Sequence, residues 1–123
     1  MTIQKLVFLF IVITLLSCCS SPLKHTEEEA VYKEELSSTI YKVRNEDSLR
    51  VILHKFIDEN NVVGKMLCYK SIGVRQRESA RFSEAIKSHQ QGLDLALQLK
   101  DTIEIVQAMN NLGTNFRRIG AHG

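Results

Sequence analysis

The last third of the chain contains the sequence ARFSEAIKSHQQGLDLALQLKDTIEIVQAMNNLGTNFRRIG, residues 80–120. We read it as one amphipathic helix, a short turn and a second helix, because its apolar residues recur at three- and four-residue spacing. The predicted helices span about residues 82–99 and 102–119.

This stretch repeats the preceding one with a period of 40 residues, since Ile72-Gly73 returns as Leu112-Gly113. The same shift aligns further pairs of residues: Leu53 with Leu93, Ile57 with Leu97, Asn61 with Asp101, Met66 with Val106, and Cys68 with Ala108. A fixed period of this size is typical of helical solenoids. One helix pair cannot bury its apolar stripe alone, so copies stack.

Particular residue types recur within the two copies. The first copy has Tyr69, Ile72-Gly73, Ala80, Phe82, Ala85, His89 and Gly92; the second has Met109, Leu112-Gly113, Phe116 and Gly120. This pattern resembles the tetratricopeptide repeat (TPR), in a long-helix variant found in bacterial signalling proteins. The departures are Gln76 in place of an aromatic residue, His89 in place of Tyr or Phe, and a period longer than the usual 34. The resemblance covers about residues 49–120 and implies an all-α fold of stacked antiparallel helix pairs.

Two glycines fall inside predicted helices, where Gly costs about 1 kcal/mol relative to Ala. We therefore predict that a neighbouring helix approaches Gly73 and Gly113 too closely for a side chain. The partner helix carries a stripe of small residues flanked by larger ones: Ala85, Gly92 and Ala96, beside Phe82, Ile86, Leu93 and Leu97. The alternative is a pair of ordinary amphipathic helices in a bundle.

The composition supports one small all-helical domain. The chain has 123 residues, a net charge of +2 and a single proline, Pro22. The near-balanced charge gives no electrostatic case for a nucleic-acid partner. Three further helices are expected at about residues 26–43, 47–59 and 62–77. A Thr26–Glu29 capping box would start the first, and Asn45 or Asp47 would cap the second.

The N-terminal stretch differs from the rest of the chain. It has one charged side chain, Lys5, followed by the uncharged run LVFLFIVITLL at residues 6–16. These 11 residues are too few for a membrane-spanning helix, which needs about 20, but they suit a secretory signal. The following LLSC, residues 15–18, resembles the lipobox of bacterial lipoproteins, which implies cleavage before Cys18 and lipidation of its thiol. An ordinary signal peptide or an uncleaved anchor is the alternative.

This resemblance sets the expected domain organisation: a signal peptide at residues 1–17, a tether at 18–25 and the TPR-like region at 26–123. It implies export and lipid anchoring to a bacterial membrane, on the periplasmic or surface side. The remaining cysteines do not form an even disulfide framework. Cys68 aligns with Ala108 and is expected to be a small buried core residue, and the sequence gives no support for a Cys19–Cys68 disulfide.

No catalytic or cofactor motif is present in the sequence. The four histidines, His25, His54, His89 and His122, are far apart, unlike the close spacing of helical metal ligands. No Ser, Cys and His combination has the local context of a nucleophile. We therefore predict a protein that is not an enzyme and needs neither metal nor cofactor.

The sequence ends at the turn after the first helix of the second repeat, before a partner helix for it would begin. The predicted helix at residues 102–119 closes with Gly120, and we expect Ile105, Met109, Leu112, Phe116 and Ile119 to keep one flank unpaired. A solenoid usually needs about three repeats. This suggests that the chain is the N-terminal piece of a longer repeat protein.

In TPR proteins the first helix of each pair lines a groove that binds a peptide or a partner helix. By that resemblance the candidate groove residues are Lys70, Val74, Arg77, Asn110, Thr114 and Arg117; alternatively, each is an ordinary solvated side chain. The expected function is a membrane-anchored scaffold that binds a protein or peptide. The alternative function is the sensory region of a longer histidine kinase or helix-turn-helix transcriptional regulator.

Overall fold

The computed structural model describes residues 3–4 and 22–122. In these residues the long elements are all helices and no strand occurs: α2 (Pro22–Lys42), α3 (Glu46–Asp58), α4 (Val62–Glu78), α5 (Phe82–Leu99) and α6 (Thr102–His122). The prediction of an all-α fold is confirmed. The predicted lipidation residue Cys18 and almost all of the predicted signal peptide lie outside the described residues.

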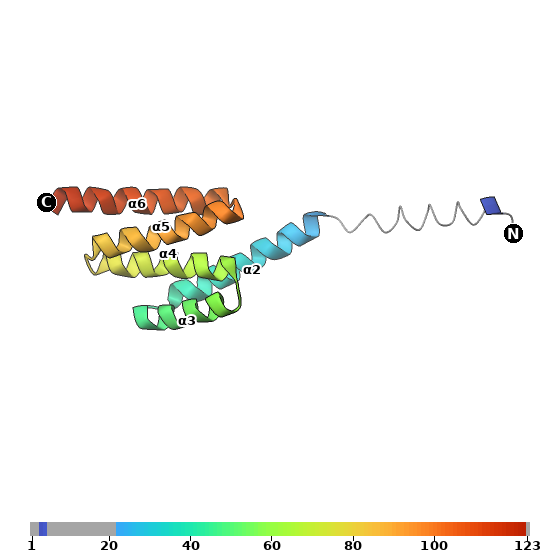
Figure 1. Cartoon of the computed structure of the whole chain (residues 1–123), viewed down its shortest axis with the longest axis horizontal. Helices are drawn as coiled ribbons and strands as arrows, with labels where there is room; N and C mark the ends of the chain where they lie inside the picture. The colour runs from blue at the N-terminus through green and yellow to red at the C-terminus, as the bar shows by residue number, and fades with distance from the viewer. Residues whose placement is uncertain (1–2, 5–21, 123) are drawn as a thin grey trace. The chain divides into compact units, whose positions relative to one another are not determined.

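The chain divides into two compact units, residues 1–34 and 35–123. Where the first unit is described, it is mainly the N-terminal part of α2, whose side chains at residues 26–34 are exposed apart from that of Lys33. The second unit contains the rest of α2 and the four helices that follow. In it α3 packs on α4, α4 on α5, and α5 on α6, and Figure 1 shows these helices side by side.

The first helix begins earlier than predicted. α2 starts at Pro22, so residues 22–25 of the predicted tether are helical, and Thr26 lies inside the helix instead of capping it. Proline suits the first helical position, because its φ angle is already helical and its missing N–H would have no partner there. The apolar stripe of this helix is thin, as expected: Ile40 is buried, and Leu36 packs beside it.

Three turns of the same geometry follow α3, α4 and α5 at intervals of 20 residues. Asn60, Ala80 and Lys100 adopt left-handed backbone conformations with φ of 51°, 58° and 55°. In each turn this residue donates its N–H to the carbonyl three residues back, and the next residue donates to the carbonyl five residues back. This Schellman arrangement satisfies the last carbonyls of a helix. Two such helix-turn units span the 40-residue period of the sequence.

Side-chain caps begin three of the helices. The Asn45 side chain accepts a hydrogen bond from Ser48 N at 2.9 Å, which confirms the predicted cap of α3. Asn61 accepts from Gly64 N at 2.8 Å, and Asp101 accepts from Glu104 N at 3.1 Å. Asn61 and Asp101 are one sequence period apart and serve the same function. The intervening Arg81 makes no side-chain cap, and its guanidinium instead contacts acidic residues.

The hydrophobic core lies between these helices. Its buried members are Ile40, Leu49, Leu53, Phe56, Met66, Leu67, Cys68, Ile72 and Ala96. Burial of Cys68 is confirmed, and its thiol is free. Leu97, one of the larger residues expected at the helix contact, is instead about half exposed.

The two helical glycines differ in their surroundings. A Cβ placed on Gly73 would lie 2.6 Å from Cε1 of His89 on α5, so the predicted close approach is confirmed there. A Cβ on Gly113 would meet nothing within 4 Å, so that part of the prediction is wrong. On α5 the predicted small-residue stripe of Ala85, Gly92 and Ala96 is buried.

The last helix is longer than predicted, because α6 runs through Gly120 to His122 without the expected turn. Of the residues predicted to remain unpaired, Met109, Phe116 and Ile119 are exposed, whereas Leu112 is buried and Ile105 is half-buried. None of the described helices is both long enough and apolar enough to span a membrane.

Candidate functional site

The six candidate groove residues lie on two helices. Lys70, Val74 and Arg77 are half-buried on α4. One period later, Asn110 and Arg117 on α6 are exposed, and Thr114 is half-buried. Each trio has i, i+4, i+7 spacing, which places its members along one side of a helix.

Polar contacts join the two helices that carry these trios. The ammonium group of Lys70 donates to Glu104 Oε2 at 2.9 Å and also to Gln107 Oε1. Further along, Arg77 Nη1 donates to Asn111 Oδ1 at 2.9 Å. α4 and α6 are therefore neighbours although α5 separates them in sequence. Glu104 was not predicted from the sequence as a partner of Lys70, because it lies 34 residues away.

The exposed end of this surface is basic. Arg117 Nη2 donates to Thr114 Oγ1 at 3.3 Å, and that hydroxyl donates to the Asn110 carbonyl at 2.9 Å. An exposed arginine and an exposed asparagine on one side of a helix can bind a carboxylate and a peptide amide, respectively. Val74, between Lys70 and Arg77, offers no polar group to a ligand.

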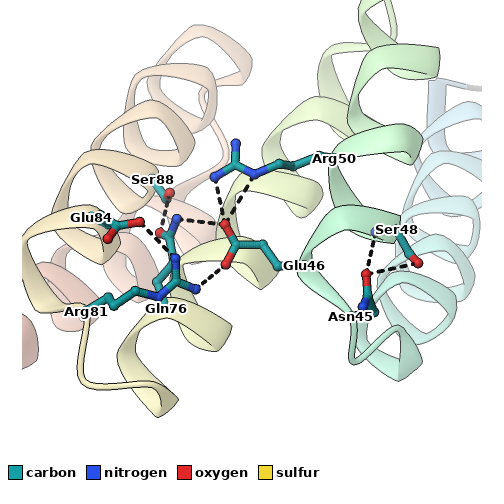
Figure 2. A network of polar contacts seen from close by, with 8 residues as sticks. All are labelled: Asn45, Glu46, Ser48, Arg50, Gln76, Arg81, Glu84 and Ser88. Atoms are coloured by element: carbon teal, nitrogen blue, oxygen red, sulfur yellow. Dashed lines mark hydrogen bonds and ion pairs between the residues drawn. The ribbon is translucent and has the colours of Figure 1, made fainter.

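A second polar cluster, centred on Glu46 in the first turn of α3, joins three helices (Figure 2). The Glu46 carboxylate accepts from Arg50 Nη2 at 2.7 Å, from Gln76 Nε2 at 3.2 Å and from Arg81. Gln76 Oε1 in turn accepts from Ser88 Oγ at 2.7 Å. The cluster thus connects the start of α3 with α4 and with the start of α5.

The electrostatics of this cluster keep Glu46 ionised. Burial raises the pKa of this carboxyl, but hydrogen bonds from Arg81, Arg50 and Gln76 outweigh it, so the net pKa lies below the ordinary value. The hydrogen bond to Glu46 raises the pKa of Arg81. The cluster also explains why a glutamine is tolerated at position 76, where the second copy has an aromatic residue. Gln76 is buried, and the cluster supplies hydrogen-bond partners for its side chain. A glutamine at an apolar position of a repeat was the only sequence signal of this cluster.

An open groove of about 230 Å³ lies beside the cluster. Side chains of α3, α4 and α5 line it: Arg50, Tyr69, Gln76, Glu84, Lys87, Ser88 and Gln91. None of the six predicted groove residues belongs to it. The groove beside the Glu46 cluster and the six predicted residues are therefore at different places on the unit.

His89 is a buried residue at the contact between α4 and α5. Its side chain is 1% exposed, its ring lies against Gly73, and burial, followed by the charges of Arg77 and Lys70, lowers its pKa to about 4. A cavity of about 10 Å³ between it, Lys70 and Glu104 is just large enough for one water molecule. Among the described side chains, no group of three or more His, Cys, Asp or Glu residues is placed to hold a metal ion.

Comparisons with known proteins add no assignment. No protein-family model matches the chain, and neither a curated protein nor a solved structure matches it. The tetratricopeptide and lipobox resemblances therefore rest on the residues quoted from the sequence.

Proposed function

We propose that this protein is a membrane-anchored, TPR-like lipoprotein that acts as a binding scaffold for a protein or peptide. The observation that carries the proposal is the pairing of helices by three equivalent turns at 20-residue intervals. Repetition of one helix-turn unit is how α-solenoids build an extended binding surface. The proposed role is binding and not catalysis.

The proposed ligand-binding surface is the α4–α6 face that carries the six candidate residues. Its cations Lys70, Arg77 and Arg117 outnumber the one acidic side chain described among their partners, Glu104. Lys70 and Arg77 are already held by α6, so they contribute charge from fixed positions. Exposed Asn110 and Arg117 supply the groups that contact the ligand. This arrangement favours a peptide with a free carboxylate, at its C-terminus or on an acidic side chain.

Selection from a displayed library of peptides with free C-termini tests this surface. We expect the selected peptides to lose most of their affinity for the Arg117→Glu variant. The matched control is Lys55→Glu, which makes the same charge change at an exposed position on α3. Equal loss in both variants, or binding that survives Arg117→Glu, would exclude this surface as the binding site.

The proposed anchor is tested separately, by incorporation of radiolabelled palmitate in a bacterial host. Label should be lost in Cys18→Ala and kept in Cys19→Ala, because only Cys18 follows the lipobox-like residues Leu15, Leu16 and Ser17. Label that persists in Cys18→Ala contradicts the lipoprotein assignment but leaves the peptide-binding proposal intact.

A further inference from the structure

α4 buries two of its faces. The first face meets α3 and the end of α2: a Cβ on Gly64 would lie 2.5 Å from the Phe56 ring, and Arg75 donates to the Tyr41 carbonyl at 2.9 Å. The second face meets α5: Gly73 lies against His89, and Gln76 accepts from Ser88. A helix covered on two sides is the interior element of a stack.

α6 repeats both faces one period later but buries only the first. The buried positions Glu104, Leu112 and Asn115 correspond to Gly64, Ile72 and Arg75 on α4. The second face is a stripe formed by Val106, Met109, Gly113 and Phe116, which corresponds to Met66, Tyr69, Gly73 and Gln76. Val106, Met109 and Phe116 are 52%, 60% and 59% exposed, whereas Met66 is 1% exposed.

We infer that the stripe of Val106, Met109, Gly113 and Phe116 is the docking surface for one amphipathic helix that has the residue spacing of α5 and runs antiparallel to α6. On α5 the residues facing α4 are Ala85, His89, Gly92 and Ala96, all buried. His89 covers Gly73, while a Cβ on Gly92 would lie 3.8 Å from the backbone of Met66 and Lys70. The docked helix therefore has small residues opposite Val106 and Met109 and a ring over Gly113.

The spacing of the turns gives this helix a route of entry. Left-handed residues end α3, α4 and α5 at positions 60, 80 and 100. The next position in this series is Gly120, and glycine adopts the left-handed conformation more readily than any other residue. It is exposed, and a Cβ on it would meet nothing within 4 Å. The same turn can form at Gly120 when a helix lies against the stripe.

A second copy of this chain fits the stripe less well. Two α6 stripes in contact would oppose Met109 and Phe116 with large residues, where α5 presents alanine and glycine to α4.

The test supplies the helix within the full chain, by replacing residues 121–123 with a copy of residues 81–101. Phe116→Trp serves as the reporter, because the sequence contains no other tryptophan. In the extended chain we expect a blue-shifted emission and loss of most acrylamide quenching, relative to Phe116→Trp in the original chain. Adding Gly113→Leu should restore the quenching, because the copied histidine could no longer lie over position 113. Val51→Trp, at an exposed position on α3, is the control and should not change.

Three results would overturn the inference. The first is acrylamide quenching of the Phe116→Trp reporter that is as strong in the extended chain as in the original chain. This result counts against the inference whether or not circular dichroism shows that the added residues are helical. The second is shielding that survives Gly113→Leu. The third is a reporter already shielded in the original chain together with a doubled mass by light scattering, which would assign the stripe to a second copy. None of these readouts depends on lipidation or on the α4–α6 binding surface.

Discussion

At the scale of single residues, the three turns differ in how well their left-handed position suits the side chain. Asparagine tolerates this conformation, but Ala80 and Lys100 bear a steric cost of roughly 1–2 kcal/mol each. We predict that Ala80→Gly and Lys100→Gly each raise the free energy of unfolding by about 0.5–1 kcal/mol, after allowing for the greater freedom of glycine in the unfolded chain. Urea denaturation followed by circular dichroism measures this.

Ala108→Gly is the matched control for these turn variants, because it makes the same change inside a helix. It should lower stability by about 1 kcal/mol. A loss of stability in Ala80→Gly or Lys100→Gly would show that these turns are not left-handed in solution.

The buried imidazole of His89 predicts a pH dependence of stability. Its pKa is about 4 in the folded protein, below the ordinary 6.5, so the unfolded chain binds a proton that the folded protein excludes between these values. Stability is therefore full above pH 6.5 and falls as the pH drops towards 4, by on the order of 3 kcal/mol in total. Denaturation at several pH values between 5 and 7 isolates this effect, because Glu46 titrates at lower pH.

His89→Gln should remove most of this slope, whatever it does to absolute stability. His54→Gln, at an exposed position on α3, controls for loss of a histidine and should keep the slope. Stability that remains constant from pH 7 to 5 in the original protein would mean that His89 is solvated.

At the scale of elements, Gly73 and Gly113 occupy equivalent positions on α4 and α6 with opposite surroundings. Gly73→Ala gains helix propensity but forces a Cβ to within 2.6 Å of the buried His89 ring, so we expect a net loss of about 1–3 kcal/mol. Gly113→Ala should gain up to about 1 kcal/mol, because its Cβ meets nothing. Thermal melting of the two variants should give shifts of opposite sign, and destabilisation by Gly113→Ala would show that another element covers α6.

The same pair of glycines shows how far sequence reasoning reaches. The 40-residue period predicted the helices, the turns and the close contact at Gly73, because spacing along a chain fixes which residues share a face. The close approach that it predicted at Gly113 is wrong, since equivalence between copies does not tell whether a neighbour is present. The capping-box pattern at Thr26 places the start of the first helix too late, because Pro22 itself occupies the first helical position of α2.

Contacts between distant residues were the other limit. Lys70 was predicted as a groove residue, but its bond to Glu104 depends on how α4 and α6 approach each other. Likewise, the contacts of Glu46 with Arg81 and Gln76 depend on how α3, α4 and α5 pack together. No local sequence pattern predicts that cluster.

At the scale of the whole molecule, Cys68 reports on the integrity of the helical unit. Its side chain is 0% exposed inside the core, and burial raises the pKa of its thiol to about 12, so both access and ionisation suppress its reaction. We predict that, in a Cys18→Ser, Cys19→Ser background, alkylation of Cys68 requires global unfolding. The ratio of the labelling rate in native protein to that in unfolded protein should then equal the unfolding equilibrium constant from denaturation.

The two glycine variants give a quantitative check of this prediction. Gly73→Ala should speed the labelling of Cys68, and Gly113→Ala should slow it. In each case the rate should change by the same factor as the unfolding equilibrium constant. Cys68 lies on α4 among core residues contributed by α2, α3 and α5, so its exposure requires the packing between these helices to open. Labelling much faster than global unfolding, and insensitive to Gly113→Ala, would show instead that the unit opens locally, with α4 separating from α3 while α5 and α6 stay folded.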